Sequence, residues 1–142
     1  MKHSTDIQLR FNDTDALGHV NNSTYFSFYD LGKTEYFHAV RGNNLFERNV
    51  DIVVAHAEVD FIEPVFLTDQ IAVQTQVSKM GTKSFTLEQQ IIDIKSGGVK
   101  CRCTTVMVGY DFKTKKTIVI SDEWRQCIAR YENRPDFLNN EK

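Results

Sequence analysis

Apolar residues recur at spacings of three and four over residues 22–41, which is the period of a helix with a buried face. Phe26 and Leu31 widen that face, so we expect this helix to be covered on most sides. Gly32 within it costs about 1 kcal/mol relative to alanine unless another backbone packs closely there. The positions that carry the pattern are Tyr25, Phe28, Tyr29, Gly32, Tyr36, Phe37 and Val40.

Most of the remaining chain alternates apolar and polar residues, as β-strands do. A change of phase at Ile91 and Ile92 predicts a β-bulge. Gly97 lies in a Ser-Gly-Gly hairpin turn. The expected strands cover residues 6–11, 53–62, 70–79, 84–94, 99–110 and 117–120.

Two further segments connect or close this pattern. Residues 43–51 read as a connection with a helical turn around Leu45 and Phe46. A short closing helix is expected over residues 121–131, with its start at Ser121. The polar tail from about Asn133 is expected to be frayed.

Consecutive antiparallel strands need one face covered, and the aromatic helix is the large apolar surface available. The sequence therefore predicts an α+β fold in which an antiparallel sheet wraps around one long central helix. The 142 residues favour a single domain over residues 1–142.

Composition removes several classes of function. The formal net charge is -2, so no basic excess suggests nucleic acid. No apolar run is long enough to span a bilayer, and no signal segment is seen at the start. An odd number of cysteines, Cys101, Cys103 and Cys127, fits a reducing, cytoplasmic location. Cys101 and Cys103 are expected to share one strand face as small core residues.

Candidate chemistry is concentrated directly before the long helix. Residues 13–25 read Asp-Thr-Asp-Ala-Leu-Gly-His-Val-Asn-Asn-Ser-Thr-Tyr, with two carboxylates, a glycine and a histidine. A helix start offers unpaired N–H groups and about half a positive charge, which suits a carbonyl oxygen that gains charge. Asp15 is the candidate nucleophile or general base, and an Asx-turn carboxylate is the alternative reading.

Other residues of this segment have two readings each. Asp13 is expected to brace the loop, and Gly18 to permit positive φ or close ligand approach. His19 either orients Asp15 or the substrate, or is a hydrogen-bonded loop histidine. Asp13, Asp15 and His19 could also form a metal site, but no further ligand is near them in sequence. One of Asn21, Asn22 and Ser23 should cap the helix.

The segment Asp13-x-Asp15-x-x-Gly18-His19-Val20-Asn21-Asn22-x-x-Tyr25 closely resembles the opening motif of the 4-hydroxybenzoyl-coenzyme A thioesterase family, which has the hotdog fold. The resemblance extends over about residues 6–130. Weaker matches are the strand 56–61, Pro64 followed by Asp69, and residues 83–85.

This resemblance implies hydrolysis of acyl-coenzyme A thioesters, with no metal and no cofactor besides coenzyme A in the substrate. It implies that Asp15 is the catalytic carboxylate and that the backbone N–H at Asn22 contacts the thioester carbonyl. Some family members have an aromatic residue or histidine at the position of Asn22. The family pairs its subunits through a continuous sheet, so a homodimer or homotetramer is expected.

Substrate contacts can be assigned to two regions. Gly18, Val20 and Tyr25 are candidate walls of the acyl site, and His56 could line the acyl pocket of a neighbouring subunit. A satisfied strand histidine and core packing of Tyr25 are the alternatives. For the phosphates of coenzyme A, the candidates are the turn residues Thr82, Lys83 and Ser84, with a solvated hairpin tip as the alternative.

Three other functions remain open from the sequence. An acyl-carrier-protein thioesterase would use the same machinery, but it needs a basic docking patch that the sequence does not clearly show. A hotdog hydratase or dehydratase would use His19 for proton transfer at an α-carbon. The last alternative is a non-catalytic acyl-CoA binding protein.

Overall fold

The computed structural model describes residues 1–42 and 50–139. Two long elements organise the first half of the chain, the helix α1 (Thr24–Arg41) and the strand β2 (Val50–Phe61). The expected helical turn at Leu45 and Phe46 lies outside the described residues. The other elements are β1 (His3–Ile7), η1 (Phe11–Asp13), β3 (Ile71–Met80), β4 (Ser84–Asp93), β5 (Val99–Asp111), β6 (Lys116–Ile118), α2 (Asp122–Glu132) and η2 (Pro135–Leu138).

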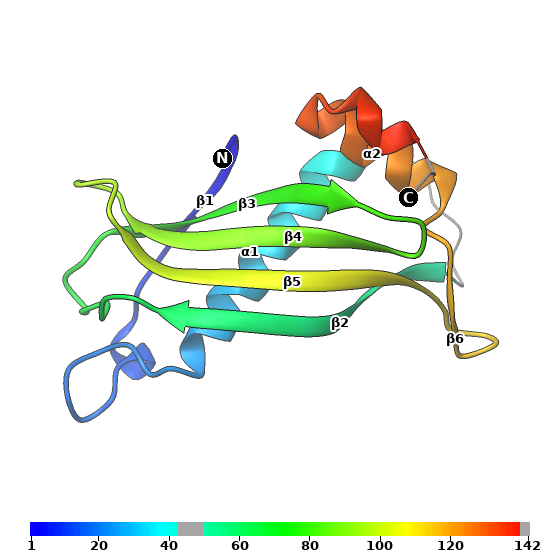
Figure 1. The fold of residues 1–142 in the computed structure, drawn as a ribbon. Helices are drawn as coiled ribbons and strands as arrows, with labels where there is room; N and C mark the ends of the chain where they lie inside the picture. The colour runs from blue at the N-terminus through cyan, green and yellow to red at the C-terminus, as the bar shows by residue number, and fades with distance from the viewer. Residues whose placement is uncertain (43–49, 140–142) are drawn as a thin grey trace. The chain divides into compact units, whose positions relative to one another are not determined.

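The described strands form a six-stranded sheet in the order β1-β3-β4-β5-β2, with β6 paired to β5 (Figure 1). β1 pairs antiparallel with β3, so that Ile7 is opposite Ile71, and β6 pairs antiparallel with β5. The predicted α+β class, an antiparallel sheet with one long helix, is confirmed.

Contacts divide the described chain into two compact units. Many of the long elements contribute residues to both. The first unit contains Met1–Tyr36, Val59–Gln76 and Gln89–Cys103, and the second contains Phe37–Glu58, Val77–Glu88 and Thr104–Lys142. The expectation of a single domain stays a prediction.

The core of the first unit joins the start of α1 to the sheet. Gly32 is buried against β3 and β4, because a Cβ atom there would lie 2.7 Å from Val73 Cγ1 and 3.0 Å from Gln89 Nε2. The close approach therefore comes from side chains and explains a glycine inside the helix. The buried apolar cluster consists of Ile7, Val20, Tyr25, Phe28, Tyr29, Val65, Ile71, Val73, Ile91, Cys101 and Cys103. Cys101 and Cys103 thus share the buried face, as predicted.

The core of the second unit gathers around Phe37, whose ring makes edge contacts with Phe85 at 6.2 Å and with Trp124 at 5.4 Å. Helix α2 begins as expected, because the Ser121 hydroxyl accepts a hydrogen bond from the Trp124 N–H. The tail is not frayed over the described residues: Phe137 is buried, and its carbonyl accepts from Arg125 at 3.0 Å.

Two details of the strands differ from expectation. The first strand ends at Ile7, and the exposed Phe11 begins a 3-10 turn because the Asp13 carboxylate accepts from the Arg10 N–H at 2.9 Å. The predicted phase change at Ile91 is wrong, since burial alternates without interruption in β4 up to that residue. Gln89 occupies an inward position there, and its amide is hydrogen bonded within the core.

Candidate active site

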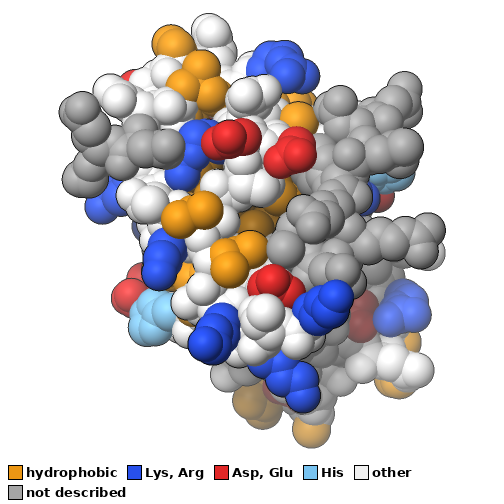
Figure 2. Space-filling model, turned by 90° about the vertical axis from the view of Figure 1, so that its right-hand side faces the viewer, with side chains coloured by type: hydrophobic (Ala, Val, Ile, Leu, Met, Phe, Trp, Pro, Cys, Tyr) orange, Lys and Arg blue, Asp and Glu red, His pale blue; other side chains and the backbone are white. Residues whose placement is uncertain are grey.

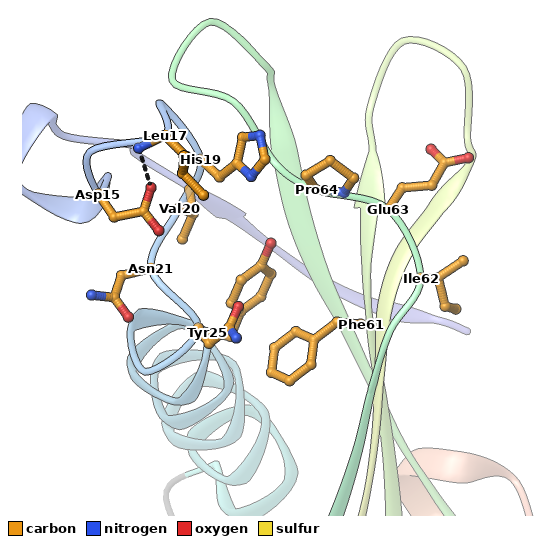
Figure 3. A pocket seen from close by; sticks show the side chains of 11 residues that line it. Asp15, Leu17, His19, Val20, Asn21, Tyr25, Phe61, Ile62, Glu63 and Pro64 are labelled. Atoms are coloured by element: carbon orange, nitrogen blue, oxygen red, sulfur yellow. Dashed lines mark hydrogen bonds between the residues drawn. The ribbon is translucent and has the colours of Figure 1, made fainter.

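A pocket of about 450 Å³ opens beside the start of α1, and its lining residues belong to the first unit (Figure 3). One side comes from the loop and the first turn of α1, and the other side comes from the end of β2 and the residues after it. The lining residues are Asp15, Leu17, His19, Val20, Asn21, Asn22, Tyr25, Phe61, Ile62, Glu63 and Pro64.

The loop before α1 folds into a tight turn. The Asp15 carbonyl accepts from the Gly18 N–H at 3.0 Å, and the Asp15 N–H donates to the His19 carbonyl at 2.8 Å. Gly18 has φ +81°, the left-handed conformation that glycine adopts without steric cost. The predicted positive φ of Gly18 is confirmed, and it sets the path of the chain between Asp15 and His19.

The Asp15 carboxylate lies at the pocket and is exposed. Its Oδ1 accepts a hydrogen bond of 2.9 Å from the Leu17 N–H, which is drawn in Figure 3. The Asx-turn reading is therefore correct for one oxygen. The second carboxylate oxygen has no hydrogen-bond donor among the described residues.

Asp13 has a different environment from Asp15. Its side chain is buried, and the carboxylate accepts from the Arg10 N–H while the Arg10 guanidinium lies 3.8 Å away. Its carbonyl accepts from the Asn21 N–H at 2.8 Å. Asp13 thus braces the loop against the segment that enters α1, as predicted.

The segment entering α1 presents a free backbone donor. The Asn21 side chain accepts from the Ser23 N–H at 3.1 Å, and the Asn21 carbonyl accepts from the Thr24 N–H at 2.9 Å. Asn21 is therefore the residue that caps this turn, and the helix begins two residues later than expected. The Asn22 N–H between them has no acceptor among the described residues.

Aromatic side chains form much of the wall. Tyr25 is buried and contacts Phe61 across the pocket, with ring centroids 5.1 Å apart. Burial raises the pKa of the Tyr25 phenol, and a hydrogen bond with the Val65 backbone acts in the opposite direction. The half-buried His19 packs edge-on against Phe66, with the two ring centroids 4.9 Å apart. Val20 is buried at the same wall.

Six lining residues were not among the predicted site residues: Leu17, Asn21, Phe61, Ile62, Glu63 and Pro64. Two of them had a signal in the sequence: Pro64 is one of the weaker matches to the family, and Asn21 is a cap candidate. The Ile62 and Glu63 N–H groups both donate to the Lys100 carbonyl, and the Glu63 carboxylate pairs with the Lys100 ammonium at 3.3 Å. These bonds hold residues 62 and 63 against Lys100 at the pocket wall. Their partner is distant in the sequence, so the spacing of residues does not predict this position.

The structure places the other predicted residues in the second unit. His56 is exposed on β2 and pairs with Glu58 at 3.1 Å, so its predicted role at an acyl pocket requires a neighbouring subunit. Thr82, Lys83 and Ser84 lie at the β3–β4 turn, and none of them lines the pocket described above. Thr82 and Lys83 are exposed there.

Within residues 1–42 and 50–139, no group of three or more His, Cys, Asp or Glu side chains is arranged to hold a metal ion. No helix in this part of the chain combines the length and apolar character needed to cross a membrane.

The carboxylate loop at the start of α1 lines a pocket in an α+β fold, and comparison with known proteins gives the family. Residues 9–128 match the model of the thioesterase-like superfamily. The chain belongs to this superfamily, and the predicted hotdog fold and thioester hydrolase class are confirmed.

Individual relatives agree with this assignment. The long-chain acyl-CoA thioesterase FadM of Escherichia coli (strain K12) is 25% identical over 130 residues, covering 89% of this chain and 96% of FadM. The acyl-CoA thioester hydrolase YbgC of Escherichia coli O6:H1 is 28% identical over 92 residues, covering 63% of this chain and 69% of YbgC. A thioesterase from Thermus thermophilus, solved with coenzyme A and Zn, has a TM-score of 0.79 at 28% identity and covers 95% of this chain and 99% of its own.

Proposed function

We propose that this protein is an acyl-CoA thioesterase that hydrolyses an acyl thioester to the free acid and coenzyme A. The observation that supports it best is the shared location of the Asp15 carboxylate and the unpaired Asn22 N–H in one pocket. The names of FadM and YbgC point to the same substrate class.

In this proposal the thioester carbonyl oxygen accepts a hydrogen bond from the Asn22 N–H. The positive end of the α1 dipole stabilises the charge that this oxygen gains in the tetrahedral intermediate. Collapse of the intermediate breaks the carbon–sulfur bond and releases the thiolate of coenzyme A, which takes a proton from water. A thiolate is a good leaving group, so a strong general acid is not required.

Asp15 supplies the attack in one of two ways. Its free oxygen attacks the carbonyl carbon and forms a mixed anhydride that water then hydrolyses, or it takes a proton from a water molecule that attacks. A single turnover in ¹⁸O-water tests the direct route: if water attacks the Asp15 carboxyl carbon of the anhydride, ¹⁸O enters Asp15 and an Asp15 oxygen passes to the acid. The general-base route places the label in the acid alone, and so does attack of water on the acyl carbon of the anhydride. Trapping the anhydride with hydroxylamine separates these last two cases.

The remaining residues of the pocket hold the acyl part. Val20 and Tyr25 provide apolar and aromatic contact, and Gly18 allows the substrate to approach the loop closely. His19 is proposed to orient the substrate or Asp15, supported by its place in the pocket lining.

We assign the phosphates of coenzyme A to the β3–β4 turn, through the Lys83 ammonium, the Ser84 and Thr82 hydroxyls and the turn N–H groups. No cofactor is needed other than the coenzyme A of the substrate. The assignment is based on the groups that the turn offers to a phosphate: an ammonium, two hydroxyls and backbone N–H groups. It is tested by replacing Lys83 with alanine, which should raise the KM for acyl-CoA more than it lowers kcat.

We propose a homodimer formed through β2, the strand at one edge of the sheet order. Val54 on this strand is 48% exposed, and an edge strand of 12 residues offers unpaired backbone groups to a second copy. His56 would then lie near the partner subunit. Light scattering should give twice the chain mass, and Val54→Lys should shift the protein towards the monomer. Tetramer formation and a cytoplasmic location stay predictions.

A thiol-release assay over acyl-CoA esters, from acetyl to long-chain and aryl, tests the activity. Including an acyl carrier protein thioester and an enoyl-CoA separates the alternatives. Release of coenzyme A from at least one ester supports the proposal. Hydration of the enoyl-CoA without thiol release would replace the proposal with a hydratase, and binding without turnover would replace it with an acyl-CoA binding protein.

A further inference from the structure

Two aromatic rings of the first unit, Tyr25 and Phe61, meet in the pocket with their centroids 5.1 Å apart. Tyr25 belongs to the first turn of α1, and Phe61 is the last residue of β2. In Figure 3 the Phe61 ring lies on the far side of Tyr25 from the Asp15 carboxylate. The two rings therefore form the wall of the pocket away from the proposed point of attack.

The Tyr25 ring is held by the core of the first unit. Tyr25 is 3% exposed and belongs to the buried apolar cluster. Its ring makes an edge contact with Phe28, with centroids 6.2 Å apart, and its phenol is hydrogen bonded with the Val65 backbone. Because packed side chains fill the space behind it, an acyl group can lie against Tyr25 but cannot push it towards the core.

Phe61 has the opposite environment. It is 47% exposed and is not a member of the buried cluster. Among the described residues, Tyr25 is the one aromatic side chain that its ring contacts. The backbone after it is held, because the Ile62 and Glu63 N–H groups both donate to the Lys100 carbonyl. The Phe61 ring is therefore a pocket wall on a fixed backbone, with no packed core behind it.

Exposure alone does not single out Phe61. Exposed apolar side chains are common on globular proteins, and Figure 2 shows small groups of them between Lys and Arg side chains on one face. Phe26 of α1 is 46% exposed, as Phe61 is, yet it does not line the pocket. The difference is that the Phe61 ring closes the pocket on one side and is open to solvent on the other.

The chemistry of the substrate indicates which of its parts meets this wall. The pantetheine arm of coenzyme A carries amides and a hydroxyl, whereas the acyl group is an alkyl chain or an aryl ring. The lining residues besides the two rings include the apolar Val20 and Pro64. With the carbonyl at the position proposed above, the acyl group therefore extends over Tyr25 towards Phe61.

We propose that Phe61 sets the length of the acyl group that this enzyme accepts: its ring ends the acyl site, and a longer chain must displace the ring. The preferred substrates are then acyl-CoA esters whose acyl group ends at or before Phe61. The inference rests on the proposed function, because it assumes that the thioester carbonyl lies between the Asp15 carboxylate and the Asn22 N–H.

The proposal predicts a maximum in the dependence of rate on chain length. Burial of one methylene group against an apolar wall corresponds to about a 4-fold gain in kcat/KM. In a series of straight-chain acyl-CoA esters, kcat/KM of wild type should rise by up to this factor per methylene group. It should reach a maximum at the length that meets Phe61 and fall beyond that length.

Phe61→Ala should move this maximum to longer chains. We expect it to raise kcat/KM about 10-fold or more for esters beyond the wild-type maximum, and to give no gain for shorter ones. Phe61→Trp should move the maximum to shorter chains. Phe26→Ala is the matched control, since it removes the same side chain at the same exposure outside the pocket, and it should keep the wild-type profile.

If Phe61→Ala changes kcat/KM by one factor for every ester, Phe61 contacts the pantetheine arm or only supports the fold, and the inference is wrong. A maximum that stays at the same chain length in both Phe61 variants would also overturn it. Light scattering on each variant should give the wild-type mass, because Phe61 belongs to the strand proposed to pair in the dimer. A shifted maximum that appears only together with a loss of mass would assign the effect to assembly and overturn the inference.

Should the Phe61 variants fail to fold, wild-type protein still gives a reading. Its probes are ketone analogues of acyl-CoA, in which a methylene group separates the sulfur from the carbonyl and prevents hydrolysis. In the analogue that binds most tightly, the terminal methyl group should show a nuclear Overhauser effect to the Phe61 ring, and its absence would overturn the inference. If wild type releases thiol from no ester, the proposed function fails, and the same measurement still tests Phe61.

Discussion

Gly32 of α1 lies directly against Val73 of β3, so that a Cβ atom at position 32 would be 2.7 Å from Val73 Cγ1. Both residues are buried. This contact brings the helix to its position on the sheet in the first unit, and it does so on the same helix whose first turn lines the pocket. The glycine therefore has a packing role that outweighs its low helix propensity.

Replacing Gly32 with alanine should lower the free energy of unfolding by about 1–3 kcal/mol, because the added methyl group overpacks a filled core. The gain in helix propensity, about 1 kcal/mol, offsets part of this cost. Urea unfolding measures the change. Ser27→Ala, at an exposed position of the same helix, is the control and should stay within about 0.5 kcal/mol of wild type. If Gly32→Ala is as stable as wild type, the Val73 side chain can move to accommodate the methyl group without a cost in stability, and the overpacking argument is wrong.

Gly18 and Gly97 have similar backbone conformations, so substitutions at these two positions test whether the conformation of the loop before α1 matters for activity. Both have positive φ, +81° and +77°, and a Cβ atom at either position meets nothing within 4 Å. Alanine should therefore cost each about 1–2 kcal/mol of stability through the backbone alone. Gly18→Ala should also reduce kcat/KM, because the turn that aims Asp15 is disturbed, whereas Gly97→Ala in the β4–β5 hairpin should not. If the two variants have equal kcat/KM, the conformation of the loop at Gly18 does not contribute to catalysis.

The role assigned to Asn22 belongs to its backbone and can be separated from its side chain. Asn22→Ala keeps the N–H, and we expect kcat to remain within about 3-fold of wild type. Replacing the N–H at residue 22 by an ester oxygen should lower kcat about 10²- to 10³-fold, the cost of one oxyanion-hole donor. Thiol release at saturating substrate gives both values. A large loss in Asn22→Ala together with little effect of the ester would assign the role to the side chain instead.

The sequence predicted those elements whose signals are local. The period of α1, the Ser121 cap of α2 and the turn glycine at position 97 depend on neighbouring residues, and all are found. The bounds predicted for the first strand were wrong, because the end of this strand depends on the pairing of Ile7 with Ile71, which is distant in the sequence. The tail was predicted to fray because Phe137 has no local reason to be buried.

The candidate site divides in the same way. Asp15, His19, Val20, Asn22 and Tyr25 were predicted because they form one continuous motif, whereas the neighbouring Leu17 was not. Phe61 and Glu63 were missed because their place opposite the loop depends on sheet pairing and on bonds to Lys100.

The central claim is that the free oxygen of Asp15 and the Asn22 N–H act on the same thioester carbonyl. Asp15→Asn tests it most directly, because the amide oxygen can still accept from the Leu17 N–H and keep the turn. We expect thiol release from the best acyl-CoA ester to fall about 10²- to 10⁴-fold, while the unfolding free energy stays within about 0.5 kcal/mol of wild type. An Asp15→Asn protein that folds normally and releases thiol at the wild-type rate would contradict the account.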